Sequence, residues 1–510
     1  MKVINLTVWV LATVLLSACS GDEGEASPPI VDEEELPPIT EEPSPETPED
    51  NKPNIIVFFT DDQGYADLGV QGIRNDIVTP NIDQLASAGV RMTHGYVTSP
   101  QCTPSRAALV TGQYPQVHGV DDNRYNPLPL GVETVAEKFS AAGYRTAAVG
   151  KWNLDIDENS HEWFALNYPG LAQGSNKVGA VPESVKEQYY PTSRGFDESF
   201  SGYGNKYWAT FDLSGATFSP KWITVSDHRI DAVSKAAVNF VERNYEEPFF
   251  MQVTHYAPHI PLSAPDRSLE QFSHVDNLRR RYALAMMAAV DDGVGSVVEA
   301  LKHKGIYENT LIFFISDNGA PTGMVQKDAP VNDLSEPWNG SLNTPLLGEK
   351  GMLTEGGVRV PFIAHWPAKI PTPKVLEKPV SVLDAVYTGL VHAGSAQSDL
   401  NSLDGVDLLP AMTGDDAYLD DRPLFFRFWQ QSAVRLGKWK FLKVGDREYL
   451  FNLDTDAPEQ SSVLTEQKEL AGVLKEQLLH WSSTLKRPVN QQGLNPQEIK
   501  WYDYYLPDAH

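Results

Sequence analysis

The chain has 510 residues, of which 41% are hydrophobic and 10% aromatic, so it is long enough for two domains with a large core. Its formal net charge of −27 argues against nucleic acid as a partner. Because a polyanionic substrate would also be repelled on average, any anion-binding site must be locally basic.

Residues 1–18 are typical of a bacterial lipoprotein signal peptide. Lys2 precedes an apolar run over residues 8–16 that is too short to span a bilayer. The segment Leu16-Ser17-Ala18-Cys19 then predicts cleavage before Cys19, with a diacylglycerol on its thiol and a palmitoyl group on its amine. This would anchor the protein in the bilayer of the bacterial cell envelope, at the outer membrane. An ordinary signal peptide with a chance cysteine is the alternative.

Residues 19–52 read as an extended, disordered tether. Twelve acidic side chains and many prolines lie between residues 20 and 52, with Lys52 as the sole basic residue. Such a segment cannot bury enough apolar surface to fold. We therefore place a catalytic domain at residues 53–395 and a smaller α+β domain at residues 396–510.

Continuous apolar runs in the larger domain predict strands buried on both faces of a parallel sheet. They occupy residues 54–60, 146–149, 249–253 and 311–315. Helical patterns between them, such as 132–142 and 282–302, indicate an α/β fold with a large, mostly parallel sheet flanked by helices. Polar residues follow each run, where such sheets bind ligands.

The smaller domain has a different sequence pattern. Short strands over residues 424–429, 433–436, 439–444 and 449–453 predict an antiparallel sheet. Leu470, Leu474, Leu478, Trp481 and Leu485 lie on one face of a predicted helix that ends before Pro488.

The second of the two cysteines begins Cys102-Thr103-Pro104-Ser105-Arg106, ahead of a helix-forming stretch. Pro104 fits the first helical turn, so Cys102 would lie at a helix N-terminus, which attracts anions. If Cys19 is acylated, no disulfide is available to Cys102. Its role is then either packing or chemistry.

Eight segments in order resemble the type I sulfatases, the formylglycine-dependent enzymes of the alkaline phosphatase-like superfamily, and the resemblance covers most of the mature chain. They are Asp61-Asp62-Gln63-Gly64, residues 79–86, residues 102–112, Gly150-Lys151-Trp152, Arg194-Gly195-Phe196-Asp197, Pro258-His259-Ile260-Pro261, Ser316-Asp317-Asn318-Gly319 and residues 350–357.

The resemblance implies one Ca²⁺ per chain and a Cys102 that a maturase oxidises to formylglycine (3-oxoalanine). Its ligands would be the side chains of Asp61, Asp62, Asp317 and Asn318, with the modified Cys102 completing the shell. Arg106 would hydrogen-bond the formylglycine hydroxyls. Lys151 and Lys350 would bind the sulfate oxygens.

The implied reaction is covalent catalysis by a gem-diol. Hydrated formylglycine attacks sulfur with Asp317 as base, and His259 protonates the departing alcohol. The second hydroxyl then loses its proton, the C–O bond breaks, sulfate leaves and the aldehyde is restored.

Two positions depart from the family pattern. Asn153 stands where the family commonly has a histidine that assists elimination, and asparagine cannot take a proton near neutral pH. His118 is a candidate replacement base, although slow turnover or an unusual substrate would also explain the change. Gln113 replaces a usual arginine, which would weaken maturation.

Substrate contacts are expected from Lys151, Asn153, His259, Lys350, Tyr207 and Trp208. An aromatic cluster suited to a sugar ring comprises Tyr203, Asn205, Lys206, Tyr207 and Trp208, with Trp338, Trp501, Tyr502, Tyr504 and Tyr505 as further members. These aromatics could instead pack the seam between the domains.

We therefore expect a sulfatase acting on a sulfated carbohydrate, with marine algal polysaccharide favoured. The alternatives are a phosphonate or phosphate ester hydrolase of the same superfamily, and a lipoprotein that binds sulfated glycans without cleaving them.

Overall fold

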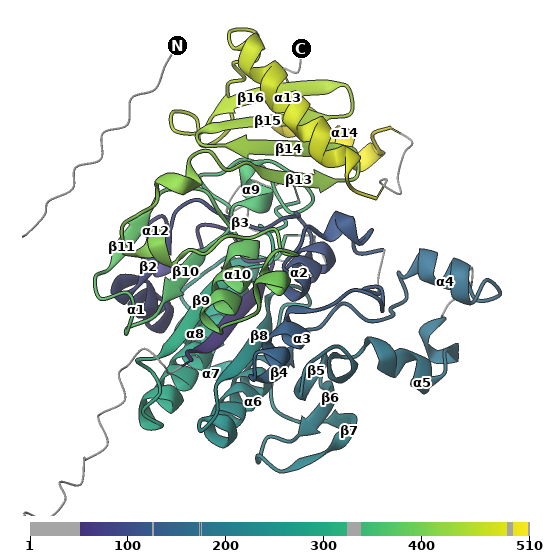
Figure 1. Cartoon of the computed structure of the whole chain (residues 1–510), viewed down its shortest axis with the longest axis vertical. Coiled ribbons are helices and arrows are strands. Elements are labelled where there is room, and N and C mark those ends of the chain that lie inside the picture. Colours follow the sequence, from purple (N-terminus) through teal and green to yellow (C-terminus); the bar gives the residue numbers. More distant parts are fainter. Residues whose placement is uncertain are drawn as a thin grey trace, which may run out of the picture. The chain divides into compact units, whose positions relative to one another are not determined.

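A ten-stranded mixed sheet forms the centre of the computed structural model (Figure 1). The middle strands β9, β1, β8, β4 and β5 run parallel, and antiparallel strands extend the sheet on both sides. In spatial order the strands are β11 (Lys374–Leu376), β2 (Val90–Met92), β10 (Phe362–His365), β9 (Thr310–Ser316), β1 (Asn54–Asp61), β8 (Phe249–Pro258), β4 (Arg145–Gly150), β5 (Glu198–Tyr203), β6 (Lys206–Phe211) and β7 (Thr217–Thr224).

The structure describes residues 52–124, 127–172, 174, 176–323, 338–486 and 493–507. The predicted signal peptide, Cys19 and all of the predicted tether except Lys52 lie outside these residues. Within the described ranges, no helix has both the length and the apolar character required to cross a bilayer.

Strand β1 shows why the sheet is buried on both faces. All eight of its residues are buried, and successive side chains point to opposite faces. Ile55, Val57 and Phe59 join one hydrophobic cluster, whereas Ile56 and Phe58 join another. This confirms the predicted α/β architecture.

Helices cover both faces of the sheet (Figure 1). The cluster of Ile55 contains side chains from α2 (Cys102–Thr111), α3 (Val135–Ala141) and α10 (Val382–His392). The cluster of Ile56 contains side chains from α1 (Pro80–Ala88), α6 (Arg229–Asn244) and α8 (Leu278–His303). The shorter elements are β3 (Gly95–Tyr96), α4 (His161–Asn167), α5 (Glu183–Lys186), α7 (Asp266–Gln271), α9 (Glu355–Val358), β12 (Val380–Ser381), α11 (Gln397–Leu400) and α12 (Leu409–Thr413).

A separate four-stranded antiparallel sheet follows, as predicted, with α13 (Lys468–Ser483) and α14 (Pro496–Tyr505). Trp481 of α13 stacks on Phe425, with ring centroids 5.0 Å apart. Val434 and Phe441 belong to the same hydrophobic cluster as Ile55, so this sheet packs onto the larger layer structure. Its strands are β13 (Leu424–Phe428), β14 (Gln431–Leu436), β15 (Trp439–Val444) and β16 (Arg447–Asn452).

Candidate active site

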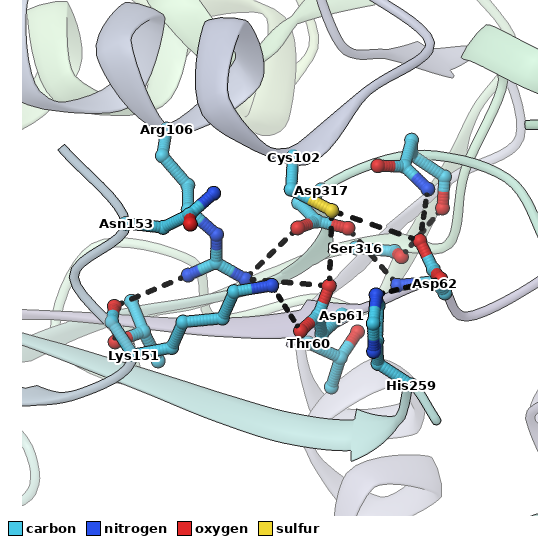
Figure 2. Close-up of polar contacts among 12 residues, drawn as sticks. Thr60, Asp61, Asp62, Cys102, Arg106, Lys151, Asn153, His259, Ser316 and Asp317 are labelled. Atoms are coloured by element: carbon cyan, nitrogen blue, oxygen red, sulfur yellow. Dashed lines mark hydrogen bonds and ion pairs between the residues drawn. The ribbon is translucent and has the colours of Figure 1, made fainter. Parts of the chain in front are cut away.

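The carboxyl ends of β1 and β9 place four polar side chains beside the start of α2 (Figure 2). Asp61 ends β1 and Asp62 follows it, while Asp317 and Asn318 directly follow β9. These two strands pair in register from Asn54 and Thr310 to Thr60 and Ser316. The pairs Asp61-Asp62 and Asp317-Asn318 therefore lie side by side at the carboxyl end of the sheet. The site predicted from separate segments is therefore assembled at one place.

Cys102 is the first residue of α2 and is 1% exposed. Its Sγ lies 3.2 Å from Asp61 Oδ1 and 3.3 Å from Lys350 Nζ. Burial, followed by the nearby carboxylates of Asp317 and Asp61, raises the pKa of the Cys102 thiol. As an unmodified thiol, Cys102 is thus a weak nucleophile.

Two buried cations and the partly buried Lys350 pair with three buried carboxylates. Arg106 Nη2 lies 2.8 Å from Asp317 Oδ2. Lys151 Nζ lies 2.6 Å from Asp61 Oδ2, and Lys350 Nζ lies 2.7 Å from Asp62 Oδ1. The three cations offset the three carboxylates in charge, so a metal cation bound to the carboxylates would make this cluster locally basic, as binding of an anion requires.

The two carboxylates near Cys102 differ in proton affinity. Burial alone would raise the pKa of Asp61, but Lys151, His259 and Arg106 together hold it well below its ordinary value. Burial and the charge of Asp61 raise the pKa of Asp317 to about 7, even though Arg106 opposes this. A carboxyl group that titrates near neutral pH suits a general base.

The same cluster offers carboxylate oxygens, the Sγ of Cys102 and a ring nitrogen of His259 to a metal ion. Ligand atoms of Asp61, Asp62, Cys102 and His259 all lie within 4.8 Å of one another. Asn318 donates from Nδ2 to Asp62 Oδ1 at 2.6 Å, and its buried Oδ1 has no hydrogen-bond partner. An orphaned amide oxygen beside carboxylates fits a hard cation.

Asp317 is held by two hydrogen bonds within this cluster. Its Oδ1 accepts a hydrogen bond from the backbone N–H of Asp62 at 3.0 Å, and its Oδ2 faces Arg106. Asp62 has a φ of 63°, a left-handed conformation that aspartate adopts more readily than most residues. The backbone N–H of Asp62 thus holds the carboxylate of Asp317 next to the end of β1.

His259 lies just beyond β8, beside Asp62 (Figure 2). Its Nε2 is 3.6 Å from Asp62 Oδ2, and its Nδ1 contacts the carbonyl of Ile260. Burial lowers the pKa of His259, while Asp61 and Asp62 act in the opposite direction. The ring is 26% exposed, so a substrate can reach it.

Asn153 reaches the start of α2 instead of Cys102. Its Nδ2 donates to Thr103 Oγ1 at 2.8 Å, and its φ of 58° is a conformation that asparagine tolerates. His118 does not replace the missing histidine, because its Nε2 lies 3.0 Å from Gln113 Oε1 and it does not line the cavity at Cys102. The hypothesis of His118 as a base is therefore wrong on geometry.

A cavity of about 450 Å³ opens beside Cys102, Lys151 and His259. Trp208 and Tyr203 line it, but Tyr207 does not, because neighbours on a strand face opposite sides. Tyr207 is fully buried and stacks on Phe200. The cavity also holds residues that sequence reasoning missed, namely Asn123, Asp155, Asp157, Asn159, Tyr190 and Trp222.

The remaining aromatic candidates lie elsewhere. Trp338 is 1% exposed and packs with Ala66 and Leu342. Trp501, Tyr502 and Tyr505 pack with Met352, Leu353 and residues of the second sheet. These three aromatics therefore serve packing, the alternative to sugar binding given above. Neither these four residues nor Tyr504, Asn205 and Lys206 line the cavity.

Comparison with known proteins identifies the class of this site. A family model described as Sulfatase matches residues 53–395. The N-acetylgalactosamine-6-sulfatase of Canis lupus familiaris is 31% identical over 419 residues, which cover 76% of this chain and 71% of that protein. The chain therefore belongs to the sulfatase family and is a sulfuric ester hydrolase.

Solved structures agree with this assignment. The crystal structure of Ps i-CgsB is 32% identical with a TM-score of 0.70, and the match covers 90% of this chain and 98% of that one. A complex of the same protein with k-i-k-neocarrahexaose gives 31% identity and a TM-score of 0.69. The phosphonate monoester hydrolase of Agrobacterium radiobacter, 19% identical with a TM-score of 0.60, shares the fold.

Proposed function

We propose that this protein removes sulfate from a sulfated carbohydrate, using a formylglycine made from Cys102 and one bound Ca²⁺. The observation that carries the proposal is the position of Cys102 at a helix start, within contact of Asp61 and Lys350 and facing a cavity with aromatic walls. Aromatic rings beside polar groups are suited to a sugar. One sulfate ester could then reach the cluster while its sugar occupies the cavity.

The names of two similar proteins support a carbohydrate substrate. One is an N-acetylgalactosamine-6-sulfatase, and the other was crystallised with k-i-k-neocarrahexaose. We propose a sulfated polysaccharide of marine algae as the source of the substrate here, with this likeness to an oligosaccharide-bound protein as support. The acidic composition of the chain agrees with a saline environment.

The oxygens of Asp61, Asp62, Asp317 and Asn318 would hold the Ca²⁺, which would supply positive charge at a sulfate oxygen. Lys151 and Lys350 now neutralise two of these carboxylates. With a divalent cation on the carboxylates, both ammonium groups are available to the sulfate. This arrangement stabilises negative charge in the transition state with fixed donors.

The proton transfers would be divided between two side chains near Cys102, Asp317 and His259. Asp317 would accept the proton of the attacking hydroxyl, held in place by Arg106 and the Asp62 amide. His259, which is partly exposed and lines the cavity, would protonate the leaving alcohol. Asn153 would orient the first turn of α2 through Thr103 and transfer no proton.

We further propose that acylated Cys19 anchors the protein to the cell envelope of the bacterium that makes it. The segment Leu16-Ser17-Ala18-Cys19 supports this anchoring. In cell fractionation, wild-type protein should stay with membranes and Cys19→Ala should be released. Retention of the variant would contradict anchoring at Cys19.

The decisive experiment combines coexpression with a formylglycine-generating maturase and two measurements. Mass spectrometry of the tryptic peptide holding Cys102 should show an aldehyde in place of the thiol. The purified protein should release sulfate from a small aryl sulfate and from sulfated galactan oligosaccharides, whereas Cys102→Ala should release none.

Rates on matched esters of one alcohol separate the alternatives. Faster turnover of the phosphate or phosphonate ester than of the sulfate ester would overturn the substrate class. An unmodified thiol combined with tight glycan binding and no sulfate release would favour the non-catalytic lipoprotein.

A further inference from the structure

Tyr190, Trp208 and Trp222 form an aromatic wall of the cavity beside Cys102. The ring centroid of Tyr190 lies 4.9 Å from that of Trp208 and 5.4 Å from that of Trp222. The two tryptophans are directly opposite each other on β6 and β7, with their centroids 5.8 Å apart. Each ring therefore contacts the other two, which stabilises the wall as one unit.

Trp222 is the member of this wall that a ligand can contact most widely. It is 43% exposed, whereas Tyr190 and Trp208 are 5% and 6% exposed. Its strand, β7, is the last strand of the sheet, and none of the residues of β7 is buried. An exposed indole that lines a cavity offers a flat apolar face, which matches the carbon-bound hydrogens on one face of a sugar ring.

The polar ends of two wall residues converge on Glu183 of α5. The hydroxyl of Tyr190 and the indole N–H of Trp222 both donate to Glu183 Oε1, at 3.0 and 2.9 Å. Lys186 Nζ lies 2.7 Å from Glu183 Oε2. Burial alone would raise the pKa of Glu183, but hydrogen bonds from Lys186, Trp222 and Tyr190 lower it below its ordinary value. The two hydrogen bonds to the rings are therefore made by a charged acceptor, which strengthens them.

The segment that carries Glu183 is itself anchored by packing. Val181 belongs to a small hydrophobic cluster with Ile156 and Phe164, and Val185 packs against this cluster. Glu183 is not among the described residues that line the cavity, so it can act on a ligand there only through the rings. It fixes an indole on an exposed edge strand before a ligand binds, which reduces the entropy that binding costs.

We propose that Trp222 is the platform on which the sugar ring of the substrate stacks, and that Glu183 is the positioning residue that fixes the indole for this contact. The inference rests on the proposed function and assigns the contact that recognises the carbohydrate part of the substrate. Contact with the sugar ring is the same before and during reaction at sulfur. It should therefore lower KM far more than it raises kcat.

The first test measures KM and kcat of maturase-treated Trp222 variants with a sulfated galactan oligosaccharide. Trp222→Ala should raise KM about tenfold, with a much smaller change in kcat. Trp222→Phe keeps an aromatic face and should raise KM much less. A wild-type KM in Trp222→Ala would overturn the inference. So would a rise in KM for Tyr203→Ala alone, because Tyr203 also lines the cavity and is 62% exposed.

The second test separates positioning by Glu183 from a general structural effect. Glu183→Ala should raise KM for the oligosaccharide about threefold, and Glu183→Gln, which keeps an oxygen acceptor for both rings, should restore most of this loss. Glu299→Ala is the matched control, because Glu299 also pairs with a lysine three residues later, at 2.8 Å, and should leave KM unchanged. Equal rises in KM for Glu183→Ala and Glu183→Gln would show that Glu183 does not position the indole through these hydrogen bonds.

A small aryl sulfate distinguishes failure of the inference from failure of the proposed function. If wild type releases sulfate from the aryl sulfate and Trp222→Ala keeps the wild-type KM for the oligosaccharide, only the inference fails. If wild type releases sulfate from neither substrate, the proposed function fails and the inference fails with it.

Discussion

At the scale of single residues, Arg229 holds the loop that carries His259. It is the first residue of α6, and its Nη2 donates to the carbonyls of His259 and Pro261 at 3.3 and 2.7 Å. Its guanidinium also lies 5.5 Å from the ring centroid of Tyr256. Because one planar group bridges two carbonyls, Arg229 fixes where the imidazole of His259 points.

Arg229→Lys should therefore impair protonation of the leaving alcohol. We expect kcat for sugar sulfates to fall about tenfold, while an aryl sulfate with an acidic phenol, which needs no proton, changes little. Arg243→Lys, on the same helix but paired with Glu198, is the matched control. Equal loss on both substrates would instead indicate a general structural defect.

A substitution at Asp62 should reveal metal binding through its effect on thermal stability. Binding of Ca²⁺ to the folded protein at about 100 times its Kd should raise the free energy of unfolding by about 2.7 kcal/mol. Asp62→Asn keeps the shape but removes a charge, so its Tm should respond weakly to Ca²⁺. An equal Tm shift in the variant would contradict a site at Asp62, and Asp292→Asn serves as the exposed control.

At the scale of elements, a buried ionic cluster ties α9 to the second sheet. Lys440 of β15 lies 2.9 Å from Glu355 and 2.8 Å from Glu459, and all three side chains have no exposure. The backbone N–H of Glu355 also donates to Glu459 at 2.6 Å. Since Glu355 lies five residues after Lys350, this cluster supports the segment that reaches Cys102.

The cluster should make stability depend on pH. Burial raises the pKa of Glu459 from 4.5 to about 7, and the charge of Glu355 adds to this, while Lys440 opposes it. Between pH 4.5 and 7 the folded protein therefore binds a proton that the unfolded chain has released, so the free energy of unfolding falls as pH rises.

In Glu459→Gln this fall should be smaller by on the order of 2 kcal/mol between pH 4.5 and 8. Urea unfolding at several pH values measures it, with the exposed Glu466→Gln as control. Identical pH profiles for Glu459→Gln and wild type would show that Glu459 does not titrate in this range.

At the scale of the whole molecule, the sequence predicts what its local patterns encode. Apolar runs such as residues 311–315 predict strands buried on both faces, and the residues after them predict the acidic cluster. The same logic places Cys102 at a helix start, because Pro104 suits the first turn and the alanines that follow favour a helix. These features need no knowledge of distant contacts.

The cavity wall could not be predicted in this way. Trp208 and Trp222 are opposite each other on the paired strands β6 and β7, while Tyr190 comes from a separate segment, and the register that brings the three rings together is not visible in the sequence. Tyr207 was chosen with Trp208 because both are aromatic, but strand alternation separates their faces and the sequence does not reveal the facing side. Glu183 gave no signal, since its role depends on two rings that reach it from other segments.

The second sheet also contacts the catalytic part directly at Asp121. Arg427 of β13 donates from Nε and Nη2 to Asp121 Oδ1 at 3.0 and 2.9 Å, and both side chains are about 5% exposed or less. Two residues on, Asn123 lines the cavity and its Oδ1 accepts the Thr103 N–H at 3.0 Å. The pair therefore links the second sheet to the first turn of α2.

Arg427→Met should leave a buried carboxylate without its partner and lower the free energy of unfolding by about 3 kcal/mol. Adding Asp121→Asn removes that charge, so the double variant should recover most of the loss. If the link also positions Asn123, the single variant should raise KM for oligosaccharides and the double variant should retain part of this defect. Chemical denaturation and steady-state kinetics of wild type, the two single variants and the double variant measure both effects. A double variant as unstable as Arg427→Met would show that the loss comes from packing of the arginine and its bond to the Lys486 carbonyl, and not from the unpaired charge.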